Sequence, residues 1–168
     1  MTEGSNTAAK RLLKEINEIH KAAARPGGVD SGVLHLSPIA EDSLFSWVAV
    51  ITSSETSGDS PYKGGRFKVA IEIPEDYPVR PPTMKFISKV CHPNVHWKTG
   101  EICLDLLKSA WSPAWTLKTA CVAISLLLDA PEPDSPLNCD AANLLRCNDR
   151  RGYDSLIKMY TSLYSETD

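Results

Sequence analysis

Prolines determine where this 168-residue chain can form regular secondary structure. Four of its twelve prolines fall between residues 74 and 82, and three more fall between residues 131 and 136. Because proline fixes φ and lacks an amide donor, neither segment can continue a sheet ladder or a helix. We expect the first to be a rigid surface loop with Val79 and Arg80 at its tip, and the second to be an extended acidic loop.

Apolar runs that are rich in β-branched and aromatic residues predict four strands in the first half of the chain. These runs cover residues 32–37, 45–52, 66–73 and 83–88, and clusters of Pro, Gly, Ser and Asp separate them. The connections between the first three strands are short, so the strands are expected to form an antiparallel meander.

Helical spacing of apolar residues predicts the remaining elements. Residues 117–128 are apolar on nearly every side, which favours a central helix lying across the sheet. Two further helices are expected at 141–146 and 150–164, and an N-terminal helix is expected to end near Arg25 and Pro26. The chain is therefore predicted to be a single α+β domain over residues 1–168. Apolar positions of the first helix are Leu12, Leu13, Ile16 and Ile19, and those of the last are Tyr153, Leu156, Ile157 and Tyr160.

Charge and cysteine content narrow the class of protein. The net charge is −3 and the basic residues are scattered, so a nucleic-acid partner is not expected. No apolar run approaches the roughly 18 residues that span a membrane, so direct membrane insertion is not expected either. The odd number of five cysteines lacks the spacing of a disulfide framework, which suits a reducing cytosol.

The segment from His92 to Trp115 concentrates the residues that can perform chemistry. Cys103 follows a glycine that permits a tight turn, in a short extended or irregular stretch that can hold a thiol at the surface. Pro93 places Asn94 on a stiff turn nine residues before this thiol. An amide donor beside a cysteine can stabilise an oxyanion, so together with the carboxylate of Asp105 these groups suggest thioester chemistry.

The residue types alone are also compatible with three different roles for these side chains. A lone cysteine is most often a small buried hydrophobe, and Cys121 in the apolar helix is interpreted in this way. Cys91 and His92, with His96 and Cys103, contain zinc-ligand types, although their spacing matches no common zinc site. A hydrolase built on a Cys–His pair is compatible with the sequence as well, because such partners need only be close in space.

Several ordered motifs resemble those of ubiquitin-conjugating enzymes. The active-site run of that family is similar to HPN at residues 92–94, G-x-I-C-L-D at 100–105 and W-S-P at 111–113. Upstream, P-Y-K-G-G-x-F at 61–67 and P-x-x-Y-P-x-x-P-P at 74–82 are similar to two further blocks in the same order. The resemblance covers essentially the whole chain and implies the ubiquitin-conjugating fold.

The resemblance implies that Cys103 receives ubiquitin as a thioester from the activating enzyme and transfers it to a lysine or cysteine. Asn94 is then expected to donate to the oxyanion, to brace the loop, or both. Asp105 and Ser135 are expected to orient the nucleophile, although many relatives carry aspartate where this chain has Ser135. No cofactor or metal is expected, since ATP is used by the upstream activating enzyme. Structural support of the site is assigned to His92 and Pro93.

The same resemblance implies a surface for the activating enzyme and RING-type ligases. Basic residues of the first helix and the tips of two loops are expected to form it. Many members of the family carry a large apolar residue where this chain has Val79, so its set of ligases is expected to be narrower. The expected binding residues are Lys10, Arg11, Lys14, Val79, Arg80, Ser112, Pro113 and Ala114.

Further features resemble the peroxisome-biogenesis branch of the family. The gap between Asn94 and Cys103 is one residue longer than in many members, Trp115 replaces a smaller residue, and segments 131–140 and 143–146 are similar to that branch. This resemblance implies peroxisomal import receptors as targets. It also implies recruitment of a cytoplasmic enzyme to the cytosolic face of the peroxisome by a membrane-anchored protein, peroxin-22 in fungi.

Two alternatives remain from the sequence. The chain can serve another ubiquitin-like modifier, or it can be a non-catalytic scaffold that binds ubiquitin. Scaffold variants of the family lack the active-site cysteine, so the intact Cys103 argues against the second alternative.

Overall fold

The computed structural model describes residues 3–24, 32–54, 58–103 and 108–166. Within these ranges four helices accompany four strands, in the order that the sequence predicts. The elements are α1 (Glu3–Ala23), β1 (Val33–Pro38), β2 (Ser46–Ile51), β3 (Phe67–Glu72), β4 (Thr83–Phe86), α3 (Leu117–Asp129), α4 (Cys139–Arg146) and α5 (Arg150–Tyr164).

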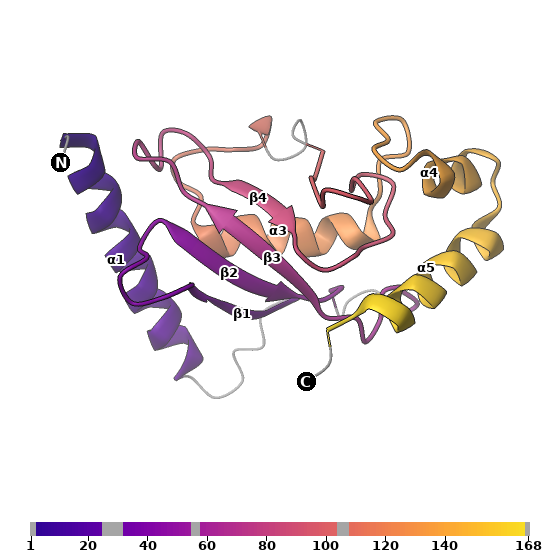
Figure 1. Cartoon of the computed structure of the whole chain (residues 1–168), viewed down its shortest axis with the longest axis horizontal. Coiled ribbons are helices and arrows are strands. Elements are labelled where there is room, and N and C mark those ends of the chain that lie inside the picture. The colour runs from indigo at the N-terminus through magenta and orange to yellow at the C-terminus, as the bar shows by residue number, and fades with distance from the viewer. Residues whose placement is uncertain (1–2, 25–31, 55–57, 104–107, 167–168) are drawn as a thin grey trace.

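The four strands form one antiparallel sheet in the order β1-β2-β3-β4, which confirms the predicted meander (Figure 1). Alternate residues of β2, β3 and β4 face the core because side chains along a strand point to opposite faces. In β2 the buried residues are Trp47, Ala49 and Ile51, and Ala49 pairs with Leu36 of β1 and Val69 of β3.

Helix α3 crosses one face of the sheet and supplies much of the core, as predicted (Figure 1). Thr116 caps the N-terminus of the helix, and its side chain accepts a hydrogen bond from the amide of Thr119. The sheet covers only one side of the helix. For this reason Ile124 is buried whereas Leu126, two residues further on, is exposed.

Helix α1 lies at one end of the sheet (Figure 1). Ala8 and Leu12 are fully buried, and Ile16 and Ile19 pack against the core. The inclusion of Leu13 in the apolar stripe is wrong, because its side chain is 53% exposed. Adjacent helical residues point about 100° apart, so Leu12 and Leu13 cannot both face the same core.

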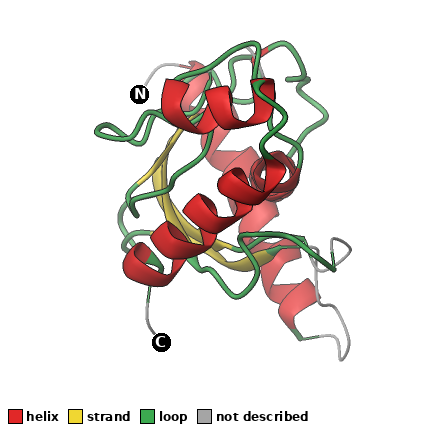
Figure 2. Ribbon diagram, turned by 90° about the vertical axis from the view of Figure 1, so that its right-hand side faces the viewer, coloured by secondary structure: helices red, strands yellow, loops and turns green. Residues whose placement is uncertain are grey.

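The two C-terminal helices lie at the opposite end of the sheet, and Figure 2 views the molecule from that end. Helix α4 begins at Cys139, two residues before its predicted start, because the side chain of Asn138 caps the amide of Ala141. Tyr153 and Ile157 bury the inner face of α5. In the part of the chain that the structure describes, no helix combines the length and apolarity needed to cross a bilayer.

Candidate active site

His92 organises the turn from which the site is built. Its ring is fully buried, Nδ1 accepts from the Asn94 amide at 3.0 Å, and Nε2 lies 2.8 Å from the carbonyl oxygen of Leu127. Because the amide must donate to Nδ1, the proton is on Nε2 and is donated to Leu127. Burial lowers the pKa of His92 to about 4, so the ring is neutral.

This geometry excludes His92 from both alternative chemistries, as a zinc ligand and as the base of a Cys–His pair. Both ring nitrogens already have partners inside the protein, so neither is free to bind zinc or to act as a base for a thiol. The ring instead fixes the position of Asn94 relative to α3, which agrees with the structural role that the family resemblance implies.

A miniature hairpin fixes Cys103 opposite Asn94. The Cys103 amide donates to the Asn94 carbonyl at 2.9 Å, and the His96 amide donates to the Glu101 carbonyl at 2.8 Å. Gly100 closes the turn with a φ of 73°, and a Cβ there would collide with the carbonyl oxygen of Phe86. The hairpin therefore fixes the backbone of Cys103 next to that of Asn94, and the Cys103 side chain is partly exposed.

The side chain of Asn94 fastens a distant loop to this turn. Asn94 is fully buried; its Nδ2 donates to the carbonyls of Glu132 at 2.8 Å and Ser135 at 2.9 Å, and its Oδ1 accepts from the Glu132 amide at 2.8 Å. The neighbouring Pro93 carbonyl accepts from the amides of Leu137 and Asn138. Both amide hydrogens of Asn94 are thus donated to loop carbonyls.

The structure brings the loop that carries Ser135 to the turn that fixes Cys103. Ser135 is exposed, and its amide donates to the Glu132 carbonyl in a tight turn. The predicted role of Asp105 concerns a residue outside the described ranges.

The remaining cysteines differ from Cys103 in environment. Cys91 and Cys121 are buried, and burial raises their pKa values to about 11 and about 12. The interpretation of Cys121 as a packing residue agrees with its position in the core. Cys139 and Cys147 are exposed on α4 and just beyond it. Cys103 is the cysteine that the HPN turn places in its hairpin.

The two loops expected to bind ligases lie side by side. The indole nitrogen of Trp111 donates to the Pro78 carbonyl at 3.0 Å, which ties the second loop to the first. Val79 is 72% exposed, and Arg80 forms a 2.6 Å ion pair with Asp76. Ser112 is partly exposed, and Pro113 and Ala114 are exposed.

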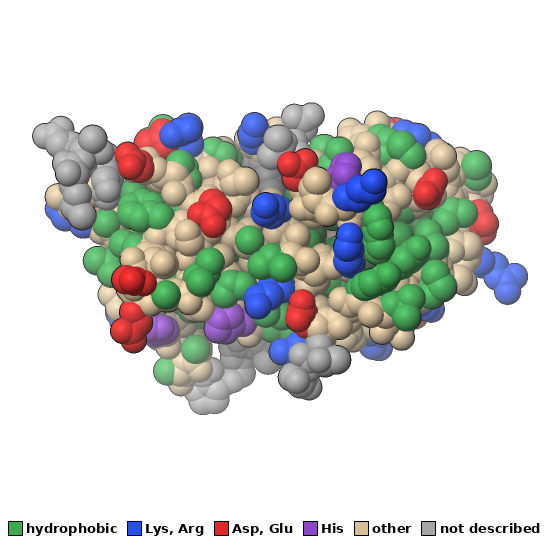
Figure 3. All heavy atoms as spheres, viewed as in Figure 1, with side chains coloured by type: hydrophobic (Ala, Val, Ile, Leu, Met, Phe, Trp, Pro, Cys, Tyr) green, Lys and Arg blue, Asp and Glu red, His purple; other side chains and the backbone are tan. Residues whose placement is uncertain are grey.

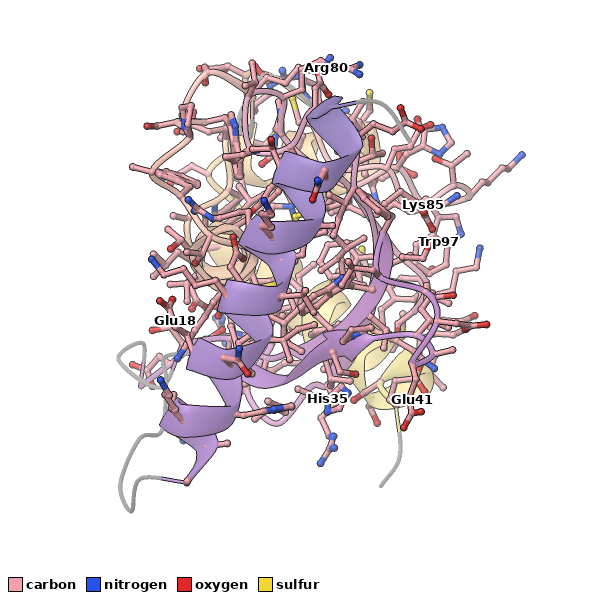
Figure 4. The ribbon with its side chains drawn as sticks, turned by 90° about the vertical axis from the view of Figure 1, so that its left-hand side faces the viewer. Glu18, His35, Glu41, Arg80, Lys85 and Trp97 are labelled. Atoms are coloured by element: carbon pink, nitrogen blue, oxygen red, sulfur yellow. The ribbon has the colours of Figure 1, made fainter. Side chains whose placement is uncertain are left out.

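The basic residues of α1 fall into two groups. Lys10 and Lys14 are exposed, and Lys14 pairs loosely with Glu18, which Figure 4 shows projecting to one side of the helix. The Arg11 side chain is only 27% exposed and contacts Glu15. Figure 4 also places Arg80 beyond the N-terminal end of α1, so the helix and the first ligase loop share one end of the molecule.

A second surface feature, an aromatic patch, is not among the features predicted from the sequence. We define the patch as Trp97, Tyr160 and Tyr164; the ring of Trp97 lies 4.9 Å from that of Tyr160 and 5.6 Å from that of Tyr164. Lys89 lies over the Trp97 ring at 5.1 Å. Figure 3 shows apolar side chains gathered over α5 beside basic ones. Its sequence signal is the i, i+4 spacing of the two tyrosines, which places them on one helix face.

A meander crossed by one helix, with a partly exposed cysteine fixed against an HPN turn, defines an acyl transferase that carries its acyl group on a thiol. A family profile described as ubiquitin-conjugating enzyme matches residues 11–161, and the chain therefore belongs to the ubiquitin-conjugating enzyme family. It is accordingly a ubiquitin transferase, and the predicted fold and family are confirmed.

Comparison with individual relatives identifies the branch. The chain is 54% identical over 156 residues to ubiquitin-conjugating enzyme E2 pex4 of Dictyostelium discoideum, covering 93% of this chain and 98% of the relative. It is 48% identical over 154 residues to protein PEROXIN-4 of Arabidopsis thaliana, covering 91% and 92%.

A solved relative agrees with this assignment. The structure of the H. polymorpha enzyme Pex4p, determined in complex with the soluble domain of Pex22p, matches with a TM-score of 0.87 and 42% identity, covering 94% of this chain and 98% of that one. The predicted similarity to the peroxisome-biogenesis branch is thus confirmed by relatives named peroxin-4.

Proposed function

We propose that Cys103 carries ubiquitin as a thioester and passes it to peroxisomal import receptors. The Cys103 thiolate attacks the carbonyl carbon of the thioester on the activating enzyme, whose own thiolate departs. An acceptor thiol or amine then attacks the new thioester, loses its proton and releases the Cys103 thiolate. The observation that supports this assignment best is the hairpin that holds a partly exposed Cys103 opposite Asn94.

Asn94 acts in this proposal mainly as a brace. Donating to an oxyanion at the thioester would require Nδ2 to leave the carbonyl of Glu132 or Ser135, and a buried unpaired carbonyl is unfavourable. Its contribution is therefore to hold the loop of Ser135 beside the thiol. His92 supports Asn94 by accepting a hydrogen bond from its backbone amide, and it takes no proton from Cys103.

The site suits an acceptor group that loses its proton easily at neutral pH. At neutral pH a lysine is neutral in roughly one molecule in two thousand, whereas a few per cent of ordinary thiols are ionised. A carboxylate beside the thioester can help a lysine to lose its proton, and Ser135 offers an uncharged hydroxyl instead. We therefore propose that the loop of Ser135 makes the enzyme prefer cysteine over lysine as the acceptor.

Recruitment is assigned to the aromatic patch. Tyr164 is 43% exposed, and exposed aromatic rings are enriched at protein interfaces because they bury much apolar area with little loss of side-chain freedom. Trp97 lies at the turn of the hairpin that carries Cys103 at its other end, so a partner bound there leaves the thiol open. The proposed occupant is the soluble domain of a peroxisomal membrane protein like Pex22p, with which the H. polymorpha relative was solved. This would hold the enzyme at the cytosolic face of the peroxisome.

A charging assay tests the proposed function. The protein is incubated with ATP and each of several purified activating enzymes with its own modifier, and reductant-sensitive adducts are measured. Charging with ubiquitin supports the proposal, whereas charging only with another modifier, or with none, contradicts it and favours the corresponding alternative.

A further inference from the structure

A buried carboxylate in α1 joins three separate segments of the chain. Glu15 is only 2% exposed, and its Oε1 accepts from Nε of Arg11 at 2.8 Å and from the hydroxyl of Tyr77 at 2.7 Å. Its Oε2 accepts from the amide of Leu117 at 2.8 Å. The carboxylate therefore contacts its own helix, the proline-rich loop and the first residue of α3.

A second set of contacts completes a circuit between the same segments. Nη2 of Arg11 donates to the Trp115 carbonyl at 2.8 Å, and the Trp115 ring lies 6.1 Å from that of Trp111. Trp111 in turn lies 5.8 Å from the ring of Tyr77 and donates to the carbonyl of Pro78. We call these five linked residues the α1 circuit: Arg11, Glu15, Tyr77, Trp111 and Trp115.

The chemistry of the α1 circuit makes it sensitive to small changes. A buried carboxylate is unfavourable unless several donors satisfy it, so each donor to Glu15 is held firmly in place. Burial and the hydrogen bond to Glu15 raise the pKa of Tyr77 far above its usual value, which keeps its hydroxyl a donor. Hydrophobic packing alone would fix the segments with less angular precision, because it is not directional.

We propose that Glu15 is a positioning residue for ligase recognition: it sets the loop of Val79 and Arg80 and the loop of Ser112 to Ala114 at one fixed distance from α1. The inference rests on the proposed function and on ligase binding at these loops, which the family resemblance implies. Glu15 and the Tyr77 hydroxyl lie behind this surface and act through the residues they hold.

The test uses variants that change one polar group at a time. Three groups donate hydrogen bonds to the Glu15 carboxylate, and Glu15→Gln leaves one of them facing an amide nitrogen, which cannot accept. Tyr77→Phe removes one of these donors while keeping the aromatic ring and the carboxylate. Tyr153→Phe is the matched control, because it also deletes a buried tyrosine hydroxyl, one that meets Tyr62 rather than the α1 circuit. Tyr77→Phe keeps the test decisive even where Glu15→Gln folds poorly.

The first readout is discharge of the ubiquitin thioester with an isolated RING domain, selected from a panel because it accelerates the wild-type enzyme. Each ligase-stimulated rate is divided by the ligase-free rate of the same variant. We expect the KM for the RING domain to rise about fivefold in either single variant, the equivalent of one buried hydrogen bond, and not in Tyr153→Phe. The double variant should lose little more than the larger single, because the two residues act as one unit.

The second readout needs no ligase. The indole N–H resonance of Trp111, assigned with Trp111→Phe, should shift in Glu15→Gln and Tyr77→Phe and stay in place in Tyr153→Phe. A change in global stability alone would leave this resonance where it is, so the shift separates positioning from general destabilisation.

Val79→Arg separates failure of the inference from failure of the proposed ligase surface. If Val79→Arg abolishes the response to the RING domain while the α1-circuit variants keep the wild-type KM and Trp111 resonance, Glu15 only packs and the inference is overturned. If Val79→Arg responds like the wild type, the ligase surface itself is assigned to the wrong loops, and the inference falls with it.

Discussion

At the scale of single residues, the site depends on buried polar side chains whose hydrogen bonds are internal. Asn94 and His92 are both fully buried, and each binds backbone groups from segments far away in the sequence. Removing one partner from such a pair leaves a buried group unsatisfied, which costs more than the bond itself contributes. Changes at these residues should therefore affect the position of the loops before they affect the chemistry of Cys103.

Asn94→Ala tests the brace. It removes three hydrogen bonds to Glu132 and Ser135, so we expect the free energy of unfolding to fall by about 2–4 kcal/mol. Discharge of the thioester should slow in parallel. Urea unfolding and single-turnover discharge measure the two effects. Unchanged stability with discharge slower by about 10²–10³-fold would instead identify an oxyanion donor.

His92 makes stability depend on pH. Its pKa is about 4 in the folded protein, against about 6.5 in an unfolded chain. The unfolded state therefore binds more protons between these values, so stability is full above pH 6.5 and is lost as pH falls toward 4. The loss should reach about 3 kcal/mol relative to the pH profile of His92→Gln, measured by urea unfolding. Parallel profiles for the two proteins would contradict the buried neutral ring.

At the scale of elements, the sequence predicts what local patterns determine. Strand alternation and helical spacing depend on neighbouring residues, so the meander and the helices could be predicted. The partners of Asn94 could not, because they lie 38 and 41 residues further along the chain. Glu15 could not be separated from other polar residues of an exposed helix face, since its burial depends on Tyr77 and Leu117, which only the tertiary fold brings close.

The loop of Ser135 carries the prediction on acceptor choice. Ser135→Asp places a carboxylate at the turn that Asn94 holds beside the thiol, which should help a lysine ammonium to lose its proton. We expect discharge to free lysine to rise roughly tenfold, and discharge to cysteine with a blocked α-amino group to change little. Single-turnover rates of Cys103-bound ubiquitin in the wild type and the variant provide the measurement. An unchanged ratio of the two rates would rule out this role of the loop.

At the scale of the whole molecule, the aromatic patch and the two ligase loops lie at different ends. Helices α4 and α5 are at one end of the sheet, and α1 with Arg80 is at the other (Figures 1 and 4). The recruiting partner proposed for α5 and the ligase expected near α1 would thus bind without overlapping. Cys103, on the hairpin that ends near Trp97, remains available to both ubiquitin and its acceptor.

Docking of a recruiting partner on the aromatic patch predicts that the enzyme associates with membranes only when that partner is present. Vesicles that display the soluble domain of a Pex22p-like protein should retain the enzyme, whereas bare vesicles of the same lipids should not. Tyr164→Asp should weaken retention by about tenfold or more, since a charge in an aromatic contact must lose its hydration. Ile39→Asp, a similar change at an exposed residue beyond β1, serves as the control in the flotation assay. Equal retention of Tyr164→Asp and Ile39→Asp would show that the docking surface does not lie on α5.

The most direct test of the proposed thioester mechanism is the covalent state of Cys103 after charging with activating enzyme, ATP and ubiquitin. The wild type should form an adduct that reductant cleaves. Cys103→Ser should form one that resists reductant but yields to alkali, because an oxyester replaces the thioester. Cys103→Ala should form none, while serine substitutions of Cys91, Cys121, Cys139 and Cys147 should each still charge. A reductant-sensitive ubiquitin adduct on Cys103→Ala would contradict this mechanism, because the thioester would then lie on another cysteine.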